Sequence, residues 1–244
     1  MSTELIVAII SALVAIASAF IAIYGQRKSS QLESELQRLA KVDERRYESE
    51  RTAAKFHQPL AQAAYDLQSR FYNIVTHKFF ETYVDCGTDR TRDYTINNTT
   101  FLIAQYFAWT EIIRTEIQFI DLGKDEETRE LAALRDRIYS LWQSNSKPFG
   151  TAFSVFAGEQ RAIGEALITD GPRGPACIGY GKFLRGLKVN KNQLVEMLHQ
   201  EISGLDVNEA RPRLIALQGA LIDLLAFLDP DNIRFPAKNR AKLQ

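Results

Sequence analysis

Four polar side chains at helical spacing are the first place where this sequence could perform chemistry. Asp66, Arg70, Asn73 and His77 follow one another at intervals of four, three and four residues, which places them on one flank of a helix. There His77 could act as a general acid or base, with Asp66 and Arg70 setting its environment. No nucleophile accompanies them. We favour a polar network at a bundle edge, in which Asp66 pairs with Arg70, and keep Asp66, Arg70 and His77 as the catalytic candidates.

A second candidate is Glu116, which we expect to be buried. On a helical wheel it lies among apolar residues, opposite the face that carries Glu111 and Arg114. A buried carboxylate needs a cation or several hydrogen-bond donors, and Arg161 and Arg70 are the available cations. Such a pair could be a ligand-gated switch, although a fixed pair that sets helix register is the favoured interpretation. The expected ligand or ion-pair network comprises Glu116, Arg161, Glu159 and Glu165.

The segment 169–186 is rich in glycine, as phosphate-binding loops are. A common phosphate-binding loop has two glycines separated by four residues, and the second glycine is followed directly by Lys and then by Ser or Thr. Here Gly174 and Gly179 lead into Tyr180 and Gly181 instead. We therefore expect an irregular connection between helices, with a ligand loop as the alternative.

Composition excludes several classes of function. The 244 residues include 30 basic and 30 acidic side chains, so no net charge attracts nucleic acid. The two cysteines, Cys86 and Cys177, are far apart in the sequence and belong to no paired motif, which suits a protein of a reducing compartment. His57 and His199 have no acidic or histidine neighbours at the spacing of metal ligands. We expect no metal, no cofactor and no nucleic-acid partner.

The elements that position these residues are predicted to be helices throughout. Apolar side chains recur with helical periodicity in most segments after Pro59, which we expect in a first helical turn. A polar loop is expected at 85–98, and Gly123 is expected to end a central helix. The helical segments are expected at 59–83, 99–123, 125–143, 150–168, 192–205 and 211–231.

The first segment indicates a membrane anchor. Leu5 to Tyr24 is an uncharged, mostly apolar run, long enough as a helix to cross about 30 Å of hydrocarbon. A cleaved signal peptide fits less well, because the residues before the run include an acidic side chain and the run is too long. Lys and Arg follow the span and none precedes it, which predicts an outside N-terminus and a cytoplasmic domain.

Small residues in this run recur at alternating intervals of three and four residues. After the run, leucines continue the same spacing. Membrane helices associate through small side chains, and water-exposed coiled coils through leucines, so one contact face could serve both. The alternative is that there is no contact face: Ala and Ser are common in membrane helices, and the short run of leucines shares their spacing by chance. The expected seam of a parallel homo-oligomer consists of Ala8, Ser11, Ala15, Ser18, Ala22, Gly25, Leu32, Leu36 and Leu39.

We therefore predict an all-α protein with a single N-terminal transmembrane helix, a short coiled-coil stalk and a cytoplasmic bundle of about six helices. The expected divisions are an anchor at 1–25, a helical stalk at 26–56, a helical bundle at 57–230 and a basic tail at 231–244. The tail is expected to be frayed, with contact to anionic lipid head groups as the alternative.

Three segments resemble a group of uncharacterised bacterial membrane-anchored helical proteins. They are "FHQPLAQAAYDLQSRFYNIV", "FAGEQRAIGEAL" and "FLDPDNIRFP". The resemblance implies a bacterial source and the inner membrane, and it carries no activity and no catalytic residue.

Function is expected to be binding rather than catalysis. The leading hypothesis is a membrane-anchored oligomeric scaffold or sensor whose helical domain binds a protein or small-molecule signal, with membrane lipid as a further partner. One alternative is a membrane-perturbing defence or stress effector. Another is a membrane-tethered enzyme that uses Asp66, Arg70 and His77.

Overall fold

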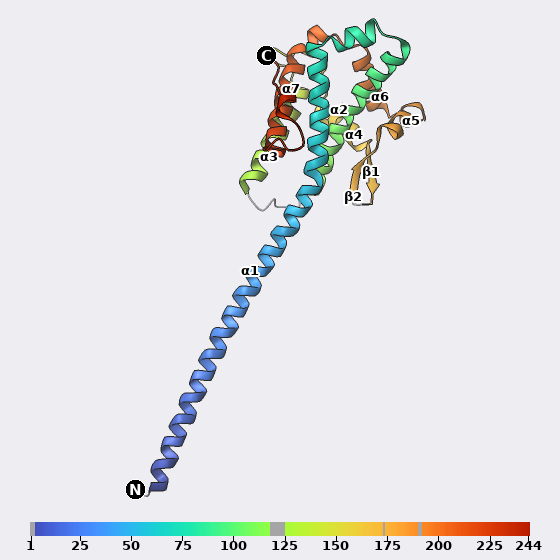
Figure 1. The fold of residues 1–244 in the computed structure, drawn as a ribbon. Coiled ribbons are helices and arrows are strands. Elements are labelled where there is room, and N and C mark those ends of the chain that lie inside the picture. Colours follow the sequence, from blue (N-terminus) through green and yellow to red (C-terminus); the bar gives the residue numbers. More distant parts are fainter. Residues whose placement is uncertain (1–2, 118–124, 173, 190–191) are drawn as a thin grey trace. The chain divides into compact units, whose positions relative to one another are not determined.

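A computed structural model describes residues 3–117, 125–172, 174–189 and 192–244, without the side chains of 4–10, 45–46 and 48–54. The chain divides into two compact units, Met1–Ser49 and Glu50–Gln244, and each is described here by itself. Helices dominate both units (Figure 1), which confirms the all-α class and the helical bundle.

Helix α1 (Thr3–Thr76) contains the predicted stalk and the first helix of the bundle. Pro59 lies inside this helix rather than in a first turn, so the expected helix start there is wrong. The segment before Pro59 is rich in strong helix formers, namely the charged residues Glu, Arg and Lys together with Ala. These residues favour the helix through a position where proline removes one amide donor.

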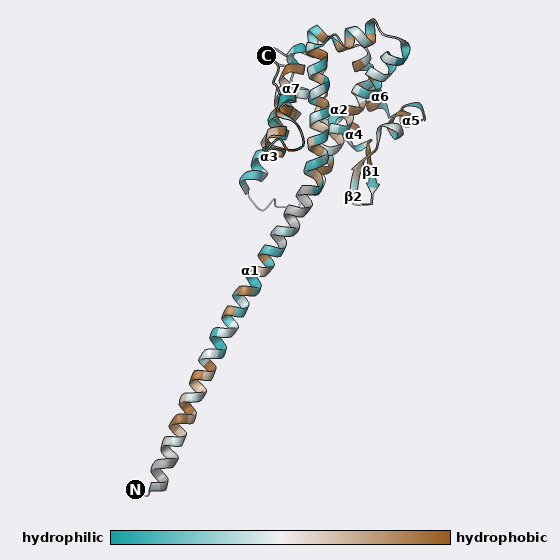
Figure 2. Cartoon of the chain, viewed as in Figure 1, coloured by the Kyte–Doolittle hydropathy of each residue, from teal (hydrophilic) through white to brown (hydrophobic). Residues whose placement is uncertain are grey.

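The apolar colours in the first part of α1 give way to mostly hydrophilic colours further along the helix (Figure 2). Within the described residues, no helix meets the length and hydropathy needed to cross a bilayer. The side chains of 4–10, which form part of the expected anchor, lie outside the described residues.

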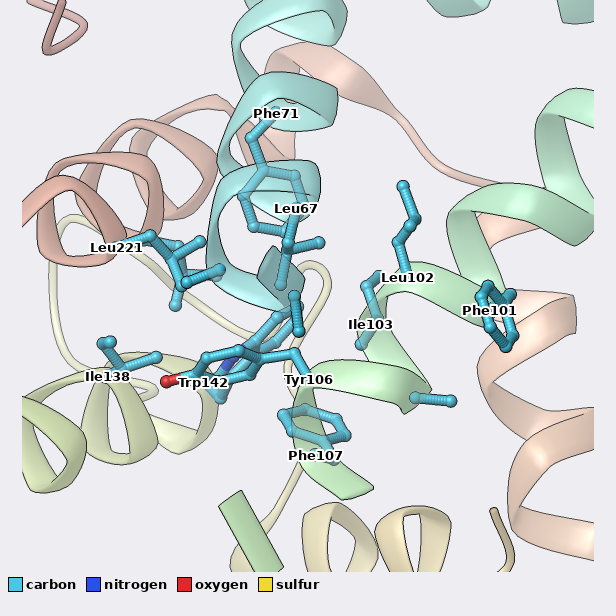
Figure 3. Packing of buried hydrophobic residues seen from close by; sticks show 14 of the residues in the cluster. Leu67, Phe71, Phe101, Leu102, Ile103, Tyr106, Phe107, Ile138, Trp142 and Leu221 are labelled. Carbon is cyan, nitrogen blue, oxygen red and sulfur yellow. The ribbon is translucent and has the colours of Figure 1, made fainter. Parts of the chain in front are cut away.

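The predicted apolar stripe of the bundle part of α1 is confirmed as a core face. Leu60, Ala64, Leu67 and Phe71 are fully buried. All four belong to one core with apolar side chains of α2 (Asp89–Ile117), α3 (Asp125–Gln143) and α7 (Val207–Leu228), and Figure 3 shows Leu67 and Phe71 among them. Trp142 of α3 packs edge-on against Phe71, Phe107 and Phe153, at ring-centroid distances of 5.9, 5.2 and 5.4 Å. This aromatic cluster joins α1, α2 and α3.

The polar segment 85–98 is not a loop beyond Thr88, because α2 already begins at Asp89. A short π-helix (Glu81–Asp85) precedes it. Buried threonines make the polar start of α2 compatible with the core: Thr99 donates to the carbonyl of Thr95 at 2.7 Å, and Thr100 to that of Ile96 at 2.9 Å. The hydroxyls are thus satisfied within the helix, which a count of polar residues does not reveal. The expected helix end at Gly123 lies outside the described residues.

The expected helix at 150–168 is shorter, since α4 spans only Ala157–Glu165. The residues before it form an irregular segment in which Phe153 is buried and Phe156 is half exposed. Close helix approach occurs at Gly164, where an added Cβ would lie 2.7 Å from the carbonyl oxygen of Phe107. Glycine at this position lets α4 contact the backbone of α2.

The glycine-rich segment is a small hairpin rather than an irregular connection. Strands β1 (Ile168–Gly171) and β2 (Gly174–Cys177) pair antiparallel, and helices α5 (Tyr180–Val189) and α6 (Gln193–Ser203) follow. The strands are too short and too polar to give a recognisable alternating pattern. The side chain of Asn192 caps α6 by accepting hydrogen bonds from two backbone amides.

Arg213 of α7 is a fully buried cation that we did not predict. Its guanidinium donates to the carbonyl oxygens of Leu141, Trp142, Ser144, Gly150 and Ala152, at 2.5 to 3.0 Å. Several of these carbonyls belong to the C-terminal end of α3, where the helix dipole favours positive charge. Arg213 therefore fixes the end of α3 and the irregular segment after it.

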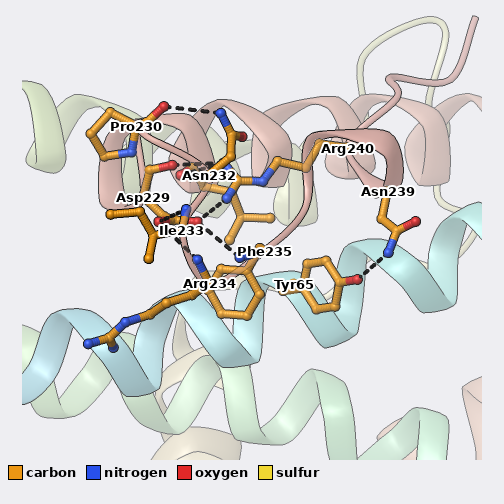
Figure 4. A network of polar contacts seen from close by, with 10 residues as sticks. Tyr65, Asp229, Pro230, Asn232, Ile233, Arg234, Phe235, Asn239 and Arg240 are labelled. Carbon is orange, nitrogen blue, oxygen red and sulfur yellow. Dashed lines mark hydrogen bonds and ion pairs between the residues drawn. The ribbon is translucent and has the colours of Figure 1, made fainter.

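The C-terminal segment is packed rather than frayed, so that expectation is wrong (Figure 4). The ring of Phe235 stacks on Tyr65 of α1 at 4.7 Å, and Asn239 donates to the Tyr65 hydroxyl at 2.8 Å. A short 3-10 helix (Ala237–Asn239) lies in this segment. Buried Gln218 of α7 donates to the carbonyl of Ala241 at 2.9 Å.

A buried ion pair holds the start of this segment. Asp229 pairs with Arg240 and also accepts hydrogen bonds from the backbone amides of Ile233 and Phe235, both at 3.1 Å. Burial works to raise the pKa of Asp229, but these amides and the Arg240 charge outweigh it, so the pKa lies below its ordinary value. The carboxylate is therefore kept ionised.

Candidate functional site

The catalytic candidates do not meet in one constellation. Asp66 is half-buried and accepts a hydrogen bond from Gln62 at 2.9 Å. His77 lies beyond the end of α1, exposed, with its ring 5.7 Å from that of Tyr72. Among the described residues, no hydrogen bond or ion pair joins Asp66, Arg70 and His77 to one another, so the expected pairing of Asp66 with Arg70 is absent.

Arg70 belongs to a different environment. Its side chain is buried, donates to the Asn98 side chain at 2.5 Å and lies over the ring of Phe79 at 4.4 Å. Burial lowers the pKa of Arg70, and interactions with Tyr94 and Tyr180 oppose that shift. These contacts join α1 to α2 and to the residues that follow α1, which is a structural role.

The predicted buried carboxylate is on α2, but it is Glu111 rather than Glu116. Glu116 is half-buried near the end of α2 at Ile117, whereas Glu111 is 5% exposed. Arg114, one turn further on, donates to both Glu111 oxygens at 2.5 to 3.0 Å. The face assigned to solvent is covered because α4 packs directly against the backbone at Phe107.

The other members of the predicted network are dispersed around this pair. Glu159 accepts a hydrogen bond from the backbone amide of Phe156 at 2.7 Å, at the start of α4. Glu165 is exposed and raises the pKa of Arg114 only after the larger effect of Glu111. Arg161 is exposed, with its guanidinium 5.9 Å from the centre of the Tyr139 ring.

A small pocket lies where Glu111 and Arg161 come together. Its volume is about 100 Å³, and helices α2, α3 and α4 all contribute to its wall. Arg135 of α3 donates to the carbonyl of Thr110 at 3.4 Å, and Gln160 of α4 donates to the carbonyls of Tyr139 and Val155. The lining residues are Tyr106, Phe107, Thr110, Glu111, Arg114, Arg135, Asp136, Tyr139, Gln160 and Arg161.

A wider groove runs beside α5 and α6. Its volume is about 910 Å³, and apolar residues such as Phe183 and Leu187 line it together with Lys182 and His199. The imidazole Nε2 of His199 lies 2.9 Å from the side-chain oxygen of Asn97. Burial lowers the pKa of His199, with Asp93 and Glu196 opposing, so the ring is neutral at pH 7. The groove offers an apolar floor with a few polar groups.

In the described part of the chain, neither cysteine is placed as a reactive thiol and no group of side chains is placed to bind a metal ion. Cys86 is exposed, and burial raises the pKa of Cys177 to about 12, which keeps that thiol protonated. In the part of the chain that the structure describes, no three His, Cys, Asp or Glu side chains gather where they could hold a metal ion.

The predicted seam lies on the first unit, and the structure holds a single chain. All of its members from position 11 onward are exposed: Ser11, Ala15, Ser18, Ala22, Gly25, Leu32, Leu36 and Leu39. The side chain of Ala8 lies outside the described residues. Self-association through this face therefore stays a prediction.

Comparisons with known proteins add no relative. No family model, no curated protein and no solved structure matches this chain.

Proposed function

We propose that this protein is a membrane-anchored, self-associating scaffold or sensor whose helical domain binds a partner or a small-molecule signal. Residues 1–25 form the anchor in a bacterial inner membrane, and the domain after the stalk is cytoplasmic. The observation that carries the proposal is the uncovered apolar surface of the first unit.

Large apolar side chains in this part of α1 are exposed in the described structure. Phe20, Ile21 and Tyr24 are 71 to 73% exposed, and Leu13, Val14, Ile16 and Ile23 are 53 to 61% exposed. Leaving such a surface in water costs roughly 25 cal/mol per Å². Lipid around the helix, or a second copy against one face, removes that cost.

The charges that follow the apolar run support the orientation. Arg27, Lys28, Arg38 and Lys41 all come after it, and no basic side chain comes before. Positive residues beside a membrane helix stay on the cytoplasmic side. A reporter fused after Gln244 should therefore be active in the cytoplasm, and activity only in the periplasm would contradict the orientation.

The small residues and the leucines supply one contact face for a parallel oligomer. Ala15 and Ala22 lie on this face, whereas Leu13 and Phe20 lie off it. Close approach of two helices in lipid requires small side chains where the backbones meet. The register then continues to Leu32, Leu36 and Leu39, which are 52 to 59% exposed in the single chain.

Cysteine crosslinking in membranes tests the anchor and the seam together. The full chain carries Cys86→Ser and Cys177→Ser, and a single cysteine is then introduced. Ala15→Cys and Ala22→Cys should trap dimers in the membrane fraction, whereas the matched variants Leu13→Cys and Phe20→Cys should not. Equal crosslinking at all four positions would rule out the seam, and recovery of the chain in the soluble fraction would rule out the anchor.

Binding is favoured over catalysis because, among the described residues, no hydrogen bond or ion pair joins the catalytic candidates Asp66, Arg70 and His77. Replacing Asp66 and His77 together by Ala should leave a scaffold or sensor working, provided that the protein accumulates normally. Loss of function with normal folding would favour the tethered enzyme.

A further inference from the structure

We propose that the pocket between α2, α3 and α4 binds a small oxyanion, such as a phosphate or a carboxylate group. This inference rests on the proposed function, because it names the chemistry of a signal that the helical domain would bind. The carrying observation is a pair of buried hydrogen-bond donors without an acceptor.

Tyr106 provides the first of these donors. Its side chain lines the pocket and is only 2% exposed, yet its hydroxyl has no hydrogen-bond partner. Figure 3 shows the side chain directed from α2 towards α3. Buried hydroxyls are nearly always hydrogen-bonded, because leaving one unpaired forfeits its hydration without compensation. The Tyr106 hydroxyl therefore needs a hydrogen-bond acceptor that the described part of the chain does not supply.

Arg135 provides the second donor and a positive charge. Its Nε atom is buried and has no partner, although its terminal nitrogen reaches the carbonyl of Thr110. Tyr106 and Arg135 are close enough to influence each other's ionisation. A hydroxyl and a guanidinium Nε, both without an acceptor, suit a negatively charged oxygen ligand.

Asp136 and Glu111 favour the charged form of Arg135, but among the described residues neither accepts a hydrogen bond from the Tyr106 hydroxyl or from Arg135 Nε. Glu111 is held by three hydrogen bonds from Arg114, and Asp136 is exposed on α3. Arg161 adds a further cation to the lining. Because the described residues offer no acceptor to the Tyr106 hydroxyl or to Arg135 Nε, we assign that role to a ligand from outside the chain.

The size of the pocket limits the ligand. A volume of about 100 Å³ holds several water-sized groups, since one water needs on the order of 10 to 15 Å³ by this measure. An oxyanion fits that space, whereas the body of a larger molecule does not. Because Arg161 and Asp136 are exposed, the oxyanion could be free or could be the end group of a larger ligand.

Calorimetric titration of the full chain in neutral detergent tests the proposal. The buffer contains no phosphate or carboxylate, and sodium chloride at equal ionic strength is the control. Inorganic phosphate and acetate are the two probes, and they distinguish a tetrahedral from a planar oxyanion. We expect saturable binding of at least one probe and none of chloride.

Two variants connect the binding to the unpaired donors. Tyr106→Phe removes only the hydroxyl and should weaken binding about tenfold or more, as should Arg135→Gln. Tyr94→Phe on the same helix is the matched control, because Tyr94 is 52% exposed and does not line the pocket. Its affinity should stay within about twofold of wild type. Without ligand, Tyr106→Phe should be at least as stable as wild type, since it removes an unpaired group.

Three results would overturn the inference. The first is no saturable binding of either probe, and the second is equal affinity in wild type and Tyr106→Phe. The third is a ligand-free Tyr106→Phe protein that is clearly less stable than wild type, which would mean that ordered water forms a hydrogen bond with the hydroxyl. The crosslinking of Ala15→Cys and Ala22→Cys, measured on the same membranes, keeps failure of this inference distinct from failure of the anchor and seam.

Discussion

Replacing Arg213 by Met should destabilise the helical domain severely, because it removes the buried guanidinium. Arg213 is fully buried and donates to five backbone carbonyls, and its guanidinium lies 5.6 Å from the centre of the Phe149 ring. Methionine replaces only the apolar part of the arginine side chain and leaves these carbonyls without a donor. The irregular segment after α3 would then lose the contact that fixes it.

The magnitude follows from two opposing contributions. Hydrogen bonds that involve a charge contribute roughly 1.5 to 3 kcal/mol each, but burying the cation costs several kcal/mol in lost hydration. Removing one side of a buried charged network usually costs about 3 to 5 kcal/mol. We expect a loss in that range, which is a large part of the 5 to 15 kcal/mol that typically stabilises a domain.

Urea denaturation followed by tryptophan fluorescence measures this loss, because fully buried Trp142 lies beside the carbonyls that Arg213 binds. Arg211→Met is the matched control: Arg211 is exposed and makes one long hydrogen bond, 3.3 Å to the carbonyl of Val75. It should cost about 0.5 kcal/mol or less. Arg213→Lys keeps the charge with fewer donors and should fall between them. The reasoning is refuted if Arg213→Met and Arg211→Met unfold at the same urea concentration.

Three further outcomes are expected. Gly164→Ala should destabilise the domain by about 1 to 3 kcal/mol because its Cβ meets the Phe107 carbonyl, whereas Gly158→Ala, with open space around it, should be neutral or stabilising in thermal melts. Asp229→Asn should lower the stability of the domain at pH 7 and make stability less dependent on pH in the acid range. The pKa of Asp229 is lowered in the folded state, so its carboxylate stabilises the fold above the unfolded-state pKa of about 3.9. This stabilisation is lost as the pH falls through the folded-state pKa. Changing Leu32 and Leu36 to Asp should dissociate the oligomer in crosslinking and sedimentation, and an unchanged mass would contradict the stalk contact.

Helices with a repeating apolar stripe were predictable from the sequence. The α1 stripe around Leu67 and the extent of α3 were both expected, because periodic burial leaves a direct mark on residue order. The polar start of α2 left no such mark. Its buried threonines bond to carbonyls of their own helix, and a residue count cannot separate such threonines from those in a loop.

The sequence predicted a buried carboxylate in helix α2, but neither the residue nor its partner was predicted correctly. Glu116 was expected to pair with Arg161 or Arg70 from another segment, whereas the buried carboxylate is Glu111 and its partner Arg114 lies one turn further along the same helix. The error arose because helix geometry alone does not say which second helix will cover a face. Arg213 had a usable signal, since Leu217 and Leu224 lie on the same helical face as this cation. A charged residue on a core stripe indicates a buried network.

The distribution of charge bears on what kind of signal the domain could detect. Arg213 is bound by neutral carbonyls, and Asp229 is kept ionised by amides and by Arg240, so neither changes charge near pH 7. Burial lowers the pKa of His57 and of His199, which keeps both rings neutral in the same range. A proton is therefore a poor signal for these buried groups. An oxyanion differs from a proton as a signal, because it would bring a negative charge and acceptor atoms to Tyr106 and Arg135. These residues lie on α2 and α3, so the bound ligand would connect the two helices. Binding would then favour one arrangement of these helices.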